Sequence, residues 1–247
     1  YEEAERLYRV RGSLDPLRGV NFNPPYLDPP QLSAGAKDLS DYLRKQGCHP
    51  YRLPMACEFL PGCSCCQGYL CSRECKNDSG RICLWPALKE YGAKLLDETE
   101  VVRLEATHHE VTGVVCSHHG QTIILRGGTV ILAAGAYGTP QLLQLSGIGP
   151  AEHLREHGIP VLRDVPGIGG NLQEHPLLPV KFGARRPITL KRAESPLHLL
   201  AWLLFRRGML ASNLAEAMVF TSTTGETAPD LELCFTPVEW RQQGLGP

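Results

Sequence analysis

The sequence has no long hydrophobic run and no excess of charge of either sign. Its longest apolar stretch, Leu197 to Phe205, contains a histidine and is about half as long as a bilayer-spanning helix must be. The formal net charge is -1, and the arginine doublets at 185–186 and 206–207 are isolated. We therefore expect neither a membrane-spanning segment nor a nucleic-acid-binding surface, because the latter needs a basic stripe or patch.

The sequence shows no internal repeat and no low-complexity tract, and we expect no signal peptide at its first residues. It opens on the polar amphipathic pattern YEEAERLYRV, which favours a cytoplasmic protein. The first residue is not methionine, so we expect the natural start to lie upstream. The 247 residues, 43% of them hydrophobic and 21% charged, are typical of a soluble globular protein with one large domain or two small ones.

Hydrophobic periodicity and capping residues predict a mixture of helices and strands, an α/β (α+β) fold. Helices are predicted at 1–10, 33–47, 86–91, 140–146, 150–157 and from Ser195 onward. Strands are predicted around 101–104, 129–136, 178–186 and 230–238, with a β-hairpin at 110–127 that turns at 118–120. The run 129–136 is continuously apolar, as in a strand buried on both faces. Thr139 is the expected N-cap of the helix that follows it, with Pro140 as the first helical residue.

Small residues mark the end of that apolar run. Ala133, Ala134 and Gly135 stand between it and the helix, so that a flat or charged ligand could approach the backbone there. Folds that bind nucleotides use such a strand–turn–helix unit. Close packing of the helix on the strand would explain the small residues equally well.

The residues beyond this turn carry a specific resemblance. The stretch ILAAGAYGTPQLLQLSGIGPAEHLREHGIPVLRDVPGIGGNLQEHP, residues 131–176, closely resembles a motif of the glucose–methanol–choline (GMC) family of flavin oxidoreductases. The resemblance implies part of a Rossmann-like FAD-binding domain joined to part of a sheet-based substrate domain. It also implies FAD-dependent oxidation of a small-molecule alcohol by hydride transfer to the flavin.

The resemblance also implies roles for individual residues. Val101 matches the strand residue whose backbone meets the adenine of FAD, with Val102 as the alternative register and core packing as the structural alternative. Ala133, Ala134 and Gly135 match the turn that passes close to FAD. Glu216 matches a glutamate that faces the substrate cavity in choline-type relatives, where a buried carboxylate can hold a cationic headgroup; the alternative is a solvated edge position.

Two parts of the family pattern are absent from the sequence. No Gly-x-Gly-x-x-Gly turn is present for the pyrophosphate, and no residue can be assigned as the catalytic histidine. We therefore expect the chain to be the central portion of an enzyme about twice its length, and inactive alone. Three histidines are candidates for a functional role, but a surface position is the simpler interpretation: His153, His157 and His175.

Ten cysteines are present, and six of them lie between Cys57 and Cys75. Cys63, Cys66, Cys71 and Cys75 offer four thiols for a structural zinc ion. A reduced or disulfide-linked loop is the alternative, and the spacing does not match the ferredoxin-type runs of iron–sulfur proteins. The remaining cysteines outside this cluster are expected to be buried core residues: Cys48, Cys83, Cys116 and Cys234.

The expected organisation has four parts. A helical and proline-rich segment of the substrate side spans 1–56, a cysteine-rich loop 57–84, part of the FAD-binding domain 85–175 and part of the substrate-binding domain 176–247. The main alternative to an enzyme is a non-catalytic scaffold that acts by binding, with or without zinc on the cysteine-rich loop. The oligomeric state stays open.

Overall fold

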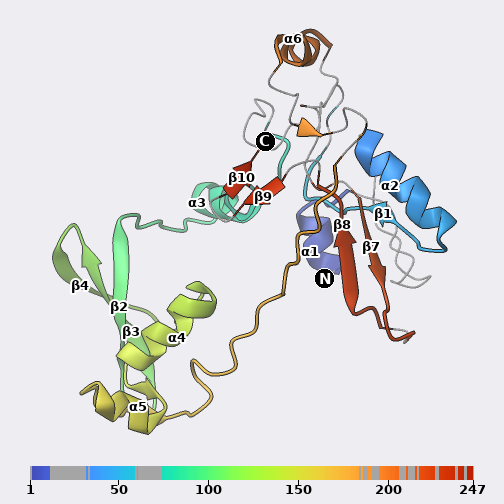
Figure 1. Ribbon diagram of the computed structural model, residues 1–247. Helices are drawn as coiled ribbons and strands as arrows, with labels where there is room; N and C mark the ends of the chain where they lie inside the picture. The colour runs from blue at the N-terminus through green and yellow to red at the C-terminus, as the bar shows by residue number, and fades with distance from the viewer. Residues whose placement is uncertain are drawn as a thin grey trace. The chain divides into compact units, whose positions relative to one another are not determined.

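The computed structural model divides the chain into two compact units, which are described separately (Figure 1). Unit 1 comprises residues 1–93 and 179–247, and unit 2 comprises residues 94–178. The structure describes residues 2–11, 32, 34–58, 60, 74–183, 185, 189–190, 195–205, 210, 215, 217–225, 228–236, 239–241 and 244–246.

Unit 2 is built on a three-stranded antiparallel sheet in the order β2-β3-β4. Its strands are β2 (Thr99–Ala106), β3 (Val111–His118) and β4 (Gln121–Arg126). The predicted hairpin is confirmed: His119 and Gly120 have φ of 48° and 77° and form the two-residue turn between β3 and β4. Positive φ at both positions matches the right-handed twist of the strands, which is why this turn type joins tight hairpins.

Two helices and a short parallel strand pair complete unit 2. They are α4 (Gly135–Leu145), β5 (Ile148–Gly149), α5 (Ala151–Glu156) and β6 (Arg163–Asp164), with β5 and β6 paired in parallel. The predicted helix at 150–157 is confirmed, and Gly158 ends it with φ +68°. The core of the unit consists of buried side chains from the sheet and both helices: Leu104, Val115, Cys116, Leu142, Ala151 and Leu154.

The predicted buried strand at 129–136 is wrong. Residues 129–134 form no strand, and the Ile131 side chain is 85% exposed. Apolar sequence alone does not make a strand, because the backbone needs a hydrogen-bonded neighbour, and none of the described strands pairs with this segment.

The predicted start of the next helix is also wrong. Helix α4 begins at Gly135, and the Thr139 hydroxyl accepts a hydrogen bond from the Ala134 N–H at 3.1 Å from inside the helix. Pro140 has no N–H to donate to the carbonyl of Ala136, four residues earlier in the helix. It is tolerated because Ala136 is exposed, so that water can donate to this carbonyl instead.

Unit 1 contains an antiparallel sheet in the order β1-β7-β8 and a separate antiparallel hairpin. The strands are β1 (Tyr51–Arg52), β7 (Ala217–Thr221), β8 (Leu231–Cys234), β9 (Glu239–Arg241) and β10 (Gly244–Gly246). Helix α2 (Ala34–Lys45) contacts β7, and Gly47, with φ +80°, follows the end of α2 as predicted. The expected strand at 178–186 is wrong in its described part, because residues 178–183 are exposed and belong to none of the strands.

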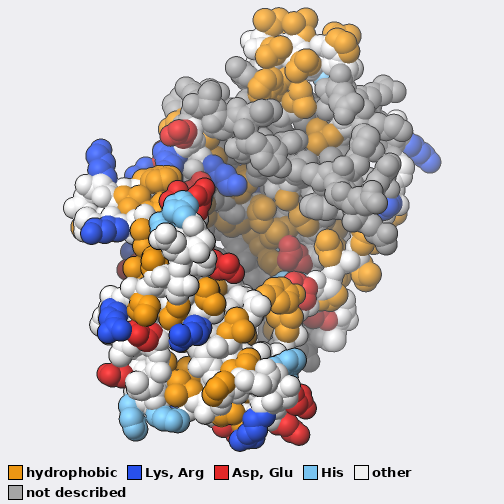
Figure 2. Space-filling model, turned by 90° about the vertical axis from the view of Figure 1, so that its left-hand side faces the viewer, with side chains coloured by type: hydrophobic (Ala, Val, Ile, Leu, Met, Phe, Trp, Pro, Cys, Tyr) orange, Lys and Arg blue, Asp and Glu red, His pale blue; other side chains and the backbone are white. Residues whose placement is uncertain are grey.

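The other helices of unit 1 are short. They are α1 (Glu2–Leu7), a π-helical turn (Gly80–Leu84) that continues into α3 (Trp85–Glu90), and α6 (Pro196–Phe205). Helix α6 begins at the predicted cap, where the Ser195 hydroxyl accepts from the His198 N–H. The leucines of α6 are largely exposed and form the hydrophobic patch at the top of Figure 2. Among the described helices, none combines the length and the apolar character needed to cross a bilayer.

Candidate functional site

The edge of the unit 2 sheet is the first candidate surface. Strand β2 is at one end of the order β2-β3-β4, so one side of its backbone is not used by this sheet. The β2–β3 register shifts between Val101 and Arg103, which is the signature of a bulge at Val102. Val101 and Val102 are 39% and 43% exposed. An apolar, irregular strand edge of this kind can offer backbone donors and acceptors to a planar polar ligand.

The corner before α4 is the second candidate surface. Ala133, Ala134 and Gly135 are all exposed. Gly135 has φ +81°, a backbone conformation that glycine adopts without strain. A Cβ added there would meet no atom of the chain within 4 Å. The corner is therefore open on the side where a side chain would stand.

Helix α4 is fixed to β2 at its other end. The Ser146 hydroxyl accepts a hydrogen bond from the buried Leu104 N–H at 2.8 Å and donates one to the Leu142 carbonyl at 2.6 Å. One side chain thus joins the last turn of α4 to the edge strand. Sequence reasoning did not single out Ser146, and its only signal was its position just before Gly147.

The glycines that follow α4 pack against the chain itself. A Cβ on Gly147 would stand 2.5 Å from the Pro160 carbonyl oxygen, and one on Gly149 would stand 2.9 Å from Gln144 Cγ. A Cβ on Gly169 would stand 2.6 Å from the side-chain amide nitrogen of Gln144. This nitrogen donates a hydrogen bond to the Ile168 carbonyl at 3.1 Å. Gly147 therefore allows a close approach to the backbone, and Gly149 and Gly169 leave room for the Gln144 side chain within unit 2.

An aspartate completes this corner. Asp164 at the end of β6 accepts a hydrogen bond from the Ala151 N–H at 3.0 Å, at the start of α5. An acceptor there satisfies one of the free amides of the first helical turn. The cap comes from 13 positions downstream, so a local search for N-cap residues could not find it.

The histidines lie at the surface of unit 2. His153 and His157 are exposed, and their rings meet edge to face with centroids 4.6 Å apart. His175 is exposed in the segment after β6. In the part of the chain that the structure describes, no group of three or more His, Cys, Asp or Glu side chains is arranged to hold a metal ion.

The cysteines are only partly described. Cys63, Cys66 and Cys71 lie outside the described residues, as does Glu216, so their predicted roles stay predictions. Cys75 is buried, and its sulfur faces that of Cys57. Cys116 is buried as expected, and burial raises the pKa of its thiol. Cys83 and Cys234 are exposed, so the prediction that they are core residues is wrong.

Comparison with known proteins defines the class. Residues 51–177, just over half of the chain, match the profile of the GMC oxidoreductase family. The chain therefore belongs to the GMC oxidoreductase family.

Two relatives illustrate the match. A GMC-type oxidoreductase of Mycobacterium tuberculosis is 38% identical over 166 residues, 66% of this chain and 31% of that protein. The oxygen-dependent choline dehydrogenase of Staphylococcus haemolyticus is 33% identical over 171 residues, 67% of this chain and 30% of that protein. The matched region thus spans about three tenths of the length of these relatives.

Solved structures agree on the fold. An FAD-dependent oxidoreductase from Chaetomium thermophilum superposes with a TM-score of 0.62 at 22% identity, over 76% of this chain and 34% of that one. Pyridoxine 4-oxidase superposes with a TM-score of 0.51 at 22% identity, over 66% of this chain and 29% of that one. The predicted mixture of helix and sheet and the predicted family are both confirmed.

Proposed function

We propose that this chain is part of an FAD-dependent oxidoreductase that oxidises the CH–OH group of a small alcohol. The observation that carries the proposal is the edge position of β2, with Val101 and Val102 exposed at an irregular point of the strand. Family membership supplies the chemistry, and this edge supplies a surface with the properties that an adenine ring requires.

The described residues fit one end of FAD. On the β2 edge, a backbone N–H and C=O near Val101 would pair with the adenine edge, and the valine side chains would exclude water from those bonds. The open corner at Ala133, Ala134 and Gly135 would let the cofactor pass near the start of α4. FAD, when bound, supplies the acceptor for the hydride that leaves the alcohol carbon.

The substrate class follows from relatives and one sequence position. We propose that the Glu216 carboxylate pairs with a cationic alcohol, because relatives named as choline dehydrogenases match this chain. A carboxylate that is partly removed from water favours a cation over a neutral alcohol of the same size. Zinc on the cysteine-rich loop remains a separate prediction that metal analysis of the purified chain would test.

The cofactor proposal is tested by equilibrium dialysis of the full chain against FAD and against FMN, which lacks the adenine. We expect FAD to bind more tightly than FMN. Val101→Glu should weaken FAD binding by about tenfold or more, because it places an unpaired carboxylate against the ring. The matched control is Ile124→Glu, since Ile124 is 50% exposed on β4 at the opposite edge of the sheet.

Three outcomes contradict this assignment. They are equal affinity for FAD and FMN, an equal loss in both variants, or no binding of FAD at all. A loss in Val102→Glu but not in Val101→Glu would move the contact to the alternative register.

Because the chain is expected to be inactive alone, the substrate proposal is tested by binding: the chain is titrated calorimetrically with choline and with a neutral alcohol of the same size. We expect a preference for choline that Glu216→Gln removes, while FAD affinity stays unchanged. Retention of the preference in Glu216→Gln would overturn the role of Glu216 and leave the cofactor assignment intact.

A further inference from the structure

Two cysteines of the cysteine-rich loop, 18 positions apart in the sequence, meet in unit 1. Cys57 and Lys76 form an antiparallel bridge, which two backbone hydrogen bonds of 2.8 Å flank: Glu58 N–H to the Cys75 carbonyl, and Asn77 N–H to the Ala56 carbonyl. The sulfurs of Cys57 and Cys75 are 3.8 Å apart. The backbone therefore holds the two thiols in contact.

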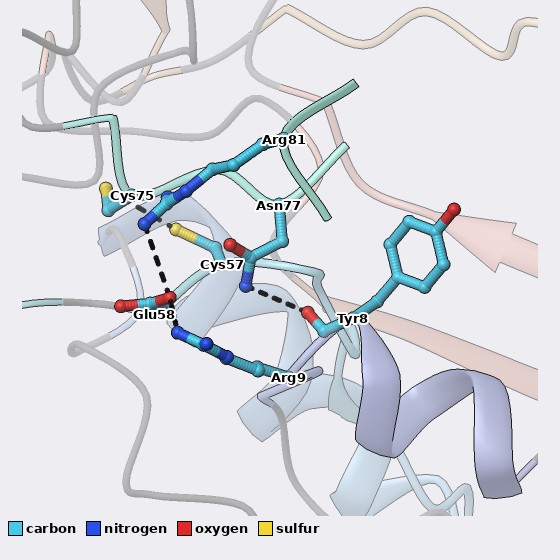
Figure 3. Close-up of polar contacts among 7 residues, drawn as sticks. All are labelled: Tyr8, Arg9, Cys57, Glu58, Cys75, Asn77 and Arg81. Carbon is cyan, nitrogen blue, oxygen red and sulfur yellow. Dashed lines mark hydrogen bonds and ion pairs between the residues drawn. The ribbon is translucent and has the colours of Figure 1, made fainter. Parts of the chain in front are cut away.

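Side chains from both sides fix this bridge in place. The Glu58 carboxylate, only 15% exposed, pairs with Arg9 at 2.6 Å and with Arg81 at 3.4 Å. The Asn77 side-chain amide donates to the Tyr8 carbonyl at 2.9 Å. Figure 3 shows the two cysteine side chains turned toward one another beside these contacts. The end of α1 and the start of the π-helical turn are thus tied to the bridge, which limits how far the sulfurs can separate.

The two thiols differ in access to solvent. Cys57 is half-buried, whereas Cys75 is 3% exposed. A small oxidant can therefore reach Cys57 first, while Cys75 can react only with a group already attached to Cys57. This asymmetry is the arrangement of an attacking and a resolving cysteine.

We propose that Cys57 and Cys75 are a redox pair that a low-molecular-weight disulfide closes into an intramolecular disulfide. The Cys57 thiolate attacks one sulfur of the small disulfide, forms a mixed disulfide and releases one small thiol. The Cys75 thiolate then attacks the Cys57 sulfur and releases the second small thiol. Two protein thiols are oxidised to one disulfide with loss of two protons, and one small disulfide is reduced to two thiols.

The geometry needs only a small change. An S–S bond is about 2.05 Å long, so the sulfurs must approach by roughly 1.8 Å, a movement within reach of side-chain rotation. The closed ring contains the other cysteines of the loop, Cys63, Cys65, Cys66 and Cys71. It also removes Cys75 from the four thiols expected to bind zinc, so the pair and that zinc site exclude one another.

The pairing is read directly in the unmodified full chain. The protein is equilibrated in glutathione buffers of graded ratio, quenched with acid and an alkylating agent, and digested with trypsin and chymotrypsin without reduction. Cleavage after Phe59 separates Cys57 from Cys63, and cleavage after Arg73 separates Cys71 from Cys75. We expect the Cys57 and Cys75 peptides to be joined, with a mass lower by two hydrogen atoms than their reduced sum.

The unfolded chain is the matched reference. In guanidinium Cys75 should link mainly to Cys71, its nearest cysteine along the chain, since loop closure favours near neighbours. Folding should therefore enrich the Cys57–Cys75 link by on the order of tenfold, because the bridge raises the effective concentration of the two thiols.

Variants test the order of the two steps. Cys75→Ser should accumulate a glutathione adduct on Cys57, and Cys57→Ser should leave Cys75 reduced. The control Cys234→Ser, in the exposed strand β8, should keep the link between Cys57 and Cys75. If a variant does not fold, the linkage in the unmodified chain decides alone. A link from Cys75 to a peptide of 60–73 would overturn the proposal. A second result would also overturn it: both thiols resist alkylation until a chelator is added, and their peptides have not lost two hydrogen atoms. That result would mark a metal site.

Discussion

Two glycines that follow helices provide a direct test of what the glycine-rich stretch does. Gly147 follows α4 with φ +80°, and Gly158 follows α5 with φ +68°. Both therefore carry the same backbone strain when changed to alanine. They differ in surroundings: a Cβ at Gly147 would stand 2.5 Å from the Pro160 carbonyl oxygen and 3.2 Å from the Leu162 nitrogen, whereas one at Gly158 meets nothing within 4 Å.

The magnitudes follow from this difference. An L-residue in the left-handed region costs about 1–2 kcal/mol, which sets the whole effect of Gly158→Ala. Gly147→Ala adds the cost of overpacking against backbone atoms that cannot rotate away, about 1–3 kcal/mol. We therefore expect Gly147→Ala to destabilise unit 2 by about 2–5 kcal/mol and Gly158→Ala by no more than about 2 kcal/mol.

Hydrogen exchange followed by mass spectrometry is the suitable assay. The three tryptophans, Trp85, Trp202 and Trp240, lie outside residues 94–178, so their fluorescence does not report on unit 2. Peptides from β2, β3 and α5 should lose protection far more in Gly147→Ala than in Gly158→Ala. Equal losses in the two variants would refute the reasoning, because the close approach at Gly147 would then contribute nothing to stability.

Two further predictions concern individual hydrogen bonds. Ser146→Ala removes the acceptor of the buried Leu104 N–H, so it should cost about 1–3 kcal/mol of stability and speed the exchange of that amide. The control Ser117→Ala should change stability by less than about 0.5 kcal/mol. Normal protection of the Leu104 amide in Ser146→Ala would contradict this prediction. The Thr223 hydroxyl and backbone N–H both donate to the Asp230 carboxylate, and these bonds hold its pKa below the ordinary 3.8. Their stabilisation is therefore complete above that value and is lost as pH falls through the lower folded pKa. Thr223→Ala should raise the Asp230 pKa in an NMR titration, and an unchanged pKa would show that the hydroxyl is not the cause.

The sequence predicted local structure correctly where one residue type or one short pattern is sufficient to specify the backbone conformation. The β3–β4 hairpin required only a turn that tolerates positive φ between two apolar runs, and His119-Gly120 provides it. Helix α2 and helix α5 ended where glycine permits a left-handed residue. The family was equally accessible, because the motif at 131–176 is long and local.

Tertiary contacts decided what local patterns leave open. Residues 129–134 have the composition of a buried strand, but a strand exists only where another segment pairs with it. The role of Gly147, Gly149 and Gly169 depends on Gln144 and Pro160, whose positions no spacing rule supplies. Thiol spacing grouped Cys75 with Cys63, Cys66 and Cys71, whereas an antiparallel bridge brings it to Cys57, 18 positions away. Sequence thus determined the hairpin, the ends of α2 and α5 and the family. The three-dimensional arrangement decided which apolar segments become strands and which residues touch, because contact depends on distance in space rather than along the chain.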